Sequence, residues 1–260
     1  MSTIELVDPE LRDALAQQLP PLTAESLTQR RSNALELAGA VPKPNLPDIA
    51  TDEIHVESAF GAKPIRVLTY RPVTSNDPLP AIVHIHGGGF VMGAPEMKDV
   101  ENRLFASELK CAIYSVDHRL APESPHPAPV EDIYSVFAWL HANAGQLGVD
   151  PTRIGIKGES GGGGFAAAAA LYARDRQGPT FAFQHLIYPM IDDRTAVRKD
   201  LILTSASLSG RKRTIISDGV PCSAKSRARP TSRLMRRRRE QWMCRACLQP
   251  TFRLAVLISS

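Results

Sequence analysis

The 260-residue sequence has few cysteines and few aromatic residues, and it lacks any long apolar run. Cys111, Cys222, Cys244 and Cys247 are too few and too unevenly spaced for a disulfide framework. No apolar run approaches the roughly 20 residues that span a bilayer, and the acidic N-terminus lacks the apolar segment of a signal peptide. We therefore expect a cytoplasmic protein with reduced cysteines and no membrane partner.

Acidic residues are almost missing from the last quarter of the chain. Residues 201–260 contain 11 Arg and 2 Lys against Asp218 and Glu240, a net charge of +11, whereas residues 1–200 carry −7. A dense basic run such as Arg236–Arg239 is typical of nucleic-acid or membrane-surface patches. Here the run has no interleaved aromatic residues and no recognisable nucleic-acid-binding motif. We therefore predict no nucleic-acid partner.

The order of apolar segments and prolines divides the chain into three parts. Residues 1–45 hold leucines at helical spacing, interrupted by Pro20-Pro21, and predict two helices. Residues 46–204 alternate strands with helices, which predicts an α/β fold with a mainly parallel sheet flanked by helices. Residues 205–260 show no periodicity. The predicted strands are 54–58, 65–71, 81–85, 112–116, 153–157 and 181–188, and the predicted core helices are 99–109, 130–144 and 161–176.

A G-x-S-x-G motif at residues 158–162 lies between a predicted strand and an Ala-rich helix. A strand, a tight turn and a helix in this order form a nucleophile elbow. Flanking glycines allow a strained turn, and the start of the helix places Ser160 Oγ near a positive dipole end. We interpret Ser160 as a catalytic nucleophile; the alternative is a glycine-rich turn with a surface serine.

A second glycine-rich segment, H-G-G-G-F at residues 86–90, directly follows a predicted strand. We expect the N–H groups of Gly87 and Gly88, together with that of Gly161, to form a three-donor oxyanion hole. Phosphate binding is the alternative, but a Walker lysine and a G-x-G-x-x-G pattern are both missing. We predict no cofactor. The other residues that support the two motifs are His86, Gly89, Gly158, Glu159 and Gly162.

Three motifs together resemble those of the bacterial hormone-sensitive-lipase-like (family IV) carboxylesterases, which have the α/β-hydrolase fold-3. The family's motifs are H-G-G-G-F, D-Y-R-L-A-P-E and G-D-S-A-G, and they match residues 86–90, 117–123 and 158–162. The departures are His118 for Tyr, Glu159 for Asp and Gly161 for Ala. The resemblance covers about residues 1–204. It implies an N-terminal helical cap over an acyl pocket, short to medium acyl ester substrates, and a homo-oligomer in intact members.

The sequence has no histidine where a catalytic base is expected. In this fold the acid and the histidine follow the nucleophile, but only His185 follows Ser160, inside a predicted strand. We interpret His185 as structural, and Asp192 and Asp193 as loop carboxylates. Without a base the serine is a poor nucleophile, so we expect this chain to be inactive or impaired. The alternative is a non-catalytic ligand-binding pseudo-hydrolase, as plant gibberellin receptors are within this family.

The composition of residues 205–260 indicates a shifted reading frame. Codons that encode Ser205–Phe252 can be chosen so that translation in the frame that starts at the third base of each codon gives the segments S-P-x-x-A-P-A and L-P-P-T-Y-I. These segments resemble the family's continuation after residue 204. Met and Trp have a single codon each, and the codons of Met235, Trp242 and Met243 are all compatible with this alternative translation. We therefore interpret residues 205–260 as an aberrant basic tail that begins near Thr204 and leaves the core at 46–204 incomplete.

Two expectations follow for this tail. The C-x-x-C pair at residues 244–247 has no histidine or second pair beside it, so we expect no metal site, with zinc as the alternative. The tail lacks the strands and helices that would complete the sheet. We therefore expect the C-terminal strands to be missing or disordered, and the sheet edge beside residues 181–188 to be uncovered.

We predict that the gene carries a frame shift near codon 204. Correcting the frame should raise the hydrolysis of a short-chain nitrophenyl ester by about 10³-fold or more, because the triad acid and histidine would return. Nucleotide sequencing and initial rates of the two chains measure this. A gene in which no alternative frame spells the family's continuation would contradict the prediction.

Overall fold

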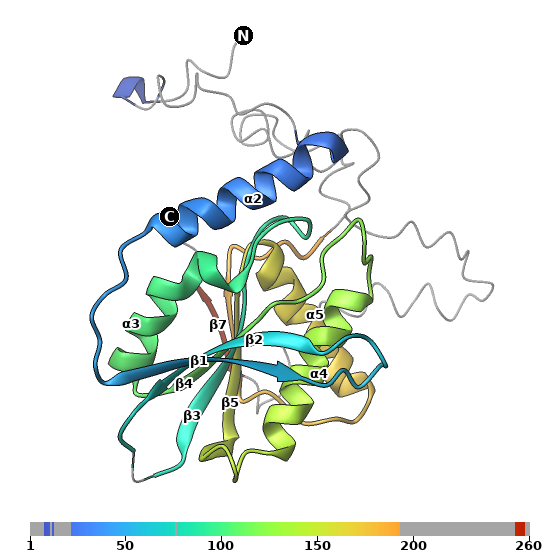
Figure 1. Cartoon of the computed structure of the whole chain (residues 1–260). Helices are drawn as coiled ribbons and strands as arrows, with labels where there is room; N and C mark the ends of the chain where they lie inside the picture. The colour runs from blue at the N-terminus through green and yellow to red at the C-terminus, as the bar shows by residue number, and fades with distance from the viewer. Residues whose placement is uncertain (1–7, 11, 13–21, 76, 193–252, 258–260) are drawn as a thin grey trace, which may run out of the picture.

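A seven-stranded sheet forms the centre of the computed structural model, which describes residues 8–10, 12, 22–75, 77–192 and 253–257 (Figure 1). The strands are β1 (Ile49–Val56), β2 (Ile65–Pro72), β3 (Leu79–Ile85), β4 (Ala112–Val116), β5 (Val149–Glu159), β6 (Phe183–Ile187) and β7 (Arg253–Leu257). Their order is β1-β2-β4-β3-β5-β6-β7, and β2 runs against its neighbours β1 and β4. The pairs from β4 to β7 are parallel. The predicted α/β fold with a mainly parallel sheet is therefore confirmed.

Helices cover both faces of this sheet (Figure 1). The helical elements are α2 (Ala24–Ala40), the 3-10 helix η2 (Pro95–Lys98), α3 (Asp99–Leu109), α4 (Ala128–Ala142) and α5 (Gly161–Asp175). Helix α3 packs on one face, and α4 and α5 pack together on the other. Among the described residues, no helix is both long and apolar enough to cross a bilayer.

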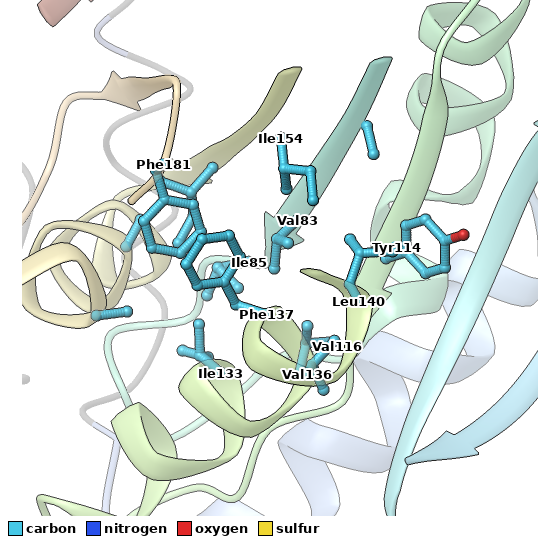
Figure 2. Packing of buried hydrophobic residues seen from close by; sticks show 14 of the residues in the cluster. Val83, Ile85, Tyr114, Val116, Ile133, Val136, Phe137, Leu140, Ile154 and Phe181 are labelled. Carbon is cyan, nitrogen blue, oxygen red and sulfur yellow. The ribbon is translucent and has the colours of Figure 1, made fainter. Parts of the chain in front are cut away.

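The two faces of the sheet have separate cores because strand side chains alternate between them. On β3, Val83 and Ile85 pack toward α4 and α5, whereas Ile82 joins a smaller cluster with Ala106 of α3. Figure 2 shows the larger cluster, where Phe137 of α4 stacks on the ring of Phe181. Strands that are buried on both faces explain why β3 and β4 read as continuous apolar runs.

The observed elements agree with the predicted ones except at the ends of some strands. Strand β1 begins at Ile49, five residues before the predicted start, because it is an edge strand whose residues from Ala50 to Glu53 are exposed. Pairing with β2 from Ile49 to Val56 extends this strand without an apolar signal in the sequence. Helix α2 confirms the second predicted N-terminal helix. The boundaries at residues 45 and 204 remain predictions.

The predicted uncovered edge beside β6 is wrong. Strand β7, from the tail, pairs in parallel with β6 from Phe183↔Arg253 to Ile187↔Leu257. Its sequence includes the run Leu-Ala-Val-Leu, one of few apolar runs in the tail, and the free N–H and C=O groups of an edge strand pair with such a segment. Residues 193–252, which hold most of the aberrant tail, lie outside the described residues.

The stacked pair in the larger core provides a test of the packing. Phe137 is 0% exposed, so Phe137→Ala should lower the free energy of unfolding by about 3–5 kcal/mol, through lost burial and a cavity. Val73→Ala, at an exposed position, should change it by less than about 0.5 kcal/mol. Urea unfolding of the two variants measures both. Equal effects of the two substitutions would contradict the described core.

Candidate active site

Ser160 lies at the turn between β5 and α5, in a backbone conformation that non-glycine residues rarely adopt. Its φ is 54° and its ψ is −119°. Three backbone hydrogen bonds hold this turn: Ser160 N–H donates to the Ile187 carbonyl (3.0 Å), and its carbonyl accepts from Gly164 (3.1 Å) and Met190 (2.9 Å). The residue is only half-buried. The strained turn therefore leaves Ser160 partly exposed.

Glycines on each side of Ser160 permit close packing of the turn. A Cβ atom on Gly158 would clash with the Gly162 carbonyl, and one on Gly162 would clash with the carbonyls of Ile85 and His86. The first turn of α5 therefore rests directly on the end of β3. Any side chain at these two positions would push the helix away from the sheet.

The glycine-rich loop at residues 86–90 lies against this elbow. A Cβ atom on Gly87 would lie 3.6 Å from the Ser160 Cβ and 3.0 Å from the carbonyl oxygen that precedes the serine. A Cβ atom on Gly161 would lie 3.1 Å from the nitrogen of Gly89. The structure thus brings together the two segments that the sequence indicated separately.

Hydrogen bonds to the loop carbonyls orient its peptide groups. The Gly87 carbonyl accepts a hydrogen bond from His86 Nδ1 (3.0 Å), and the Gly88 carbonyl accepts two from the amides of Val91 and Met92 (3.2 and 3.0 Å). A trans peptide directs its N–H opposite to its C=O. The N–H groups of Gly88 and Gly89 therefore point away from the donors that bind the Gly87 and Gly88 carbonyls.

Two stacked imidazoles lie behind the loop. His86 and His118 are both buried, with ring centroids 4.2 Å apart and planes within 13°. Each Nδ1 contacts a backbone carbonyl at 3.0 Å, so each ring is a neutral donor at that nitrogen. Burial, the largest cause, lowers the pKa of both histidines. The loop therefore packs on two uncharged rings, and His118 occupies this place where the family has tyrosine.

A buried ion cluster lies next to Ser160. Glu159 forms an ion pair with Lys157, and its Oε2 lies 3.3 Å from His84 Nε2. Lys157 Nζ also binds Glu101 Oε1 of α3 at 2.8 Å. Burial acts to raise the pKa of Glu159, but His84 and Lys157 together hold it well below its ordinary value. The negative charge of Glu159, next to Ser160, is therefore balanced by Lys157.

No sequence motif indicated Lys157, His84 and Glu101 as parts of this cluster. Lys157 and Glu159 are two residues apart on β5 and so share one sheet face, which is a signal that alternation offers. Glu101 comes from a different helix, and no local pattern connects it to the strand. Only the packing of α3 on the sheet brings Glu101 to Lys157 and Glu159.

His185 lies within β6, where it pairs in register with Lys157. Burial, followed by the charge of Lys157, lowers the pKa of His185. Paired residues on neighbouring strands share a sheet face, so the ring faces the ion cluster. This position agrees with the structural interpretation of His185. Asp193 lies outside the described residues.

The strand order and the elbow at the end of a parallel strand define the class of α/β hydrolases. A family described as "alpha/beta hydrolase fold" matches residues 82–251, and the chain belongs to this family. The match includes most of the tail that we interpret as frame-shifted. Within the described residues, no group of three or more His, Cys, Asp or Glu side chains is placed to hold a metal ion.

The relatives of the chain are named as esterases. It is 40% identical over 148 residues to the carboxylesterase NlhH of Mycobacterium tuberculosis, which covers 57% of this chain and 46% of that protein. An arylesterase of Saccharolobus solfataricus is 34% identical over 177 residues, 66% of this chain and 56% of the relative. The chain thus spans about half the length of the curated relatives it matches. The resemblance to family IV carboxylesterases is confirmed.

Solved structures give the same result. A bacterial heroin esterase superposes with a TM-score of 0.68 at 35% identity, covering 78% of this chain and 63% of that chain. A hyperthermophilic esterase of Pyrobaculum calidifontis superposes with a TM-score of 0.63 at 32% identity, covering 80% of this chain and 65% of that chain. The described fold is therefore that of an esterase core.

The ion cluster predicts a pH-dependent contribution to stability. Because the pKa of Glu159 is depressed on folding, its carboxylate stabilises the fold above its ordinary pKa of 4.5 and loses this effect as the pH falls further. Glu159→Gln should lower the free energy of unfolding at pH 7 by up to about 3 kcal/mol, since buried Lys157 then keeps only Glu101 as a charged partner. The difference from wild type should shrink below pH 4.5.

Urea unfolding at pH 7, 5.5, 4 and 3 measures this difference. Glu57→Gln, at an exposed carboxylate, is the matched control and should change stability by less than about 0.5 kcal/mol. A difference between wild type and Glu159→Gln that stays constant over this pH range would refute the role of the charge.

Proposed function

We propose that this chain is a serine carboxylester hydrolase that binds short to medium acyl esters and forms an acyl-enzyme at Ser160. One observation carries the proposal: a half-buried serine at positive φ lies against a glycine loop whose carbonyls are held by hydrogen bonds. The names of its relatives, carboxylesterase and arylesterase, support ester substrates.

The proposed chemistry follows from this arrangement. Ser160 Oγ attacks the ester carbonyl carbon, and the carbonyl oxygen gains a negative charge that backbone N–H groups stabilise. Gly88 and Gly161 are the donors with most support, since the Gly87 carbonyl is held by His86 and Gly161 begins α5. Gly87 remains a predicted donor of this oxyanion hole.

The next steps require proton transfer. Since no base is positioned for Ser160 among the described residues, its hydroxyl proton passes to solvent water as the C–O bond to Oγ forms, and the departing alkoxide takes a proton from solvent water as its own C–O bond breaks. Water then hydrolyses the acyl-enzyme to release the acid. His185, the only histidine after Ser160, faces the ion cluster. We therefore propose that acylation and turnover in this chain are slow.

Covalent labelling tests the nucleophile without a need for turnover. A fluorophosphonate probe should add its mass to the peptide that contains Ser160, and Ser160→Ala should remove this label. Ser75→Ala, at an exposed serine of a loop, should label as wild type does. Intact-mass and peptide mass spectrometry measure the label.

Turnover of p-nitrophenyl butyrate should be detectable but at least about 10³-fold below that of a relative with a complete triad. Saturable binding of p-nitrophenyl butyrate without any label at Ser160 would support the pseudo-hydrolase instead. Label on other residues alone would overturn the assignment of the nucleophile.

A further inference from the structure

The guanidinium group of Arg31, on helix α2, binds three separate points near the glycine-rich loop. Its Nε donates to the Val91 carbonyl (2.8 Å), and its Nη2 donates to the Ala121 carbonyl (2.8 Å). Nη1 and Nη2 also bind the two carboxylate oxygens of Glu123 at 2.8 and 2.9 Å. One side chain thus joins the N-terminal helix to two segments that are far apart in the sequence.

These two segments also bind each other next to the oxyanion loop. The amide of Ala121 donates to the Phe90 carbonyl (3.1 Å), and the amide of Val91 donates to the Gly88 carbonyl (3.2 Å). Arg31 therefore binds the carbonyl of Val91, and the amide of the same residue binds the Gly88 carbonyl. Movement of Val91 would change the direction of the peptide group that precedes Gly89.

Apolar packing supports the same connection. Leu22 and Leu27 are buried in a small cluster with Val91 and Ala121, separate from the two cores of the sheet. The side chain of Arg31 is 23% exposed, so its guanidinium lies at the edge of this cluster. The contact between α2 and the loop thus combines a small core with directed hydrogen bonds.

We propose that Arg31 is a positioning residue for the oxyanion hole, which acts by holding the turn after the glycine loop against α2. The inference deepens the proposed function and depends on it for its catalytic consequence. The two backbone carbonyl bonds carry the effect, because Glu123 is 60% exposed and a surface ion pair contributes little. A lysine has no planar fork and cannot make both carbonyl bonds and the bidentate pair together.

Hydrogen exchange of the full chain tests the positioning directly. Arg31→Ala should increase amide exchange in the peptide that covers residues 86–93 by about 10-fold, while exchange in β3 and α5 stays at the wild-type level. Arg31→Lys should give an intermediate rate, and Glu123→Gln, which keeps an acceptor, should stay near wild type.

Arg153→Ala is the matched control. Arg153 also binds one carboxylate, that of Asp150, and one backbone carbonyl, that of Pro78, at the opposite end of β5. Its removal should leave the exchange of residues 86–93 unchanged. Unchanged exchange of this loop in Arg31→Ala would overturn the inference. An equal increase throughout the chain would do so too, because it would show a purely structural role.

Kinetics with p-nitrophenyl butyrate test the catalytic consequence. Arg31→Ala should lower kcat by roughly 10- to 100-fold with little change in KM, because an oxyanion hole stabilises the transition state more than the bound ester. A raised KM with unchanged kcat would instead assign Arg31 to substrate binding and overturn the inference. If wild type neither turns over nor labels at Ser160, the proposed function fails, and the exchange experiment still decides whether Arg31 positions the loop.

Discussion

Direct contact between two backbones, without intervening side chains, is the constraint on which the site depends. The turn around Ser160 and the segment at residues 85–90 approach so closely that a Cβ atom at Gly162 would clash with the carbonyls of Ile85 and His86, and one at Gly161 would lie 2.9 Å from the Phe90 nitrogen. Backbone amides can face the nucleophile only where this approach is possible. The glycines therefore act through the space that they leave as much as through their conformational freedom.

The two sides of the candidate site differ in charge: uncharged rings lie behind the glycine loop, and a buried ion pair lies next to Ser160. His86 and His118 form a neutral stacked pair behind the glycine loop, whereas Glu159 and Lys157 form a buried ion pair on the other side of the turn. Such an ion pair is a weak source of net stability, but its loss is costly. It therefore restrains the end of β5 from which the elbow begins.

The N-terminal helix participates in the same assembly. Helix α2 reaches the glycine loop through Arg31 and a small apolar cluster, so the segment outside the sheet is joined to the region that would stabilise an oxyanion. If the proposed function holds, the geometry of a few amides affects the rate of acylation. Residues that touch no substrate can therefore affect catalysis through the loop that carries these amides.

The sequence by itself determined the α/β class and most of the elements, and it led to the prediction of Ser160 as the nucleophile, because each of these has a local signal. Alternating apolar segments indicated the sheet, and the glycines around Ser160 and in residues 86–90 indicated the two halves of the site. The polar first half of the edge strand β1 and the pairing of β7 with β6 had no such signal, since both depend on a neighbouring strand.

Only the tertiary structure decided how the remaining residues act. It stacked His118 on His86, brought Glu101 to Lys157, and placed Arg31 on the turn after the glycine loop. Residues of these pairs are separated by dozens of positions and belong to different elements. Their contacts arise from the packing of helices on a sheet, which local propensity and short motifs do not encode.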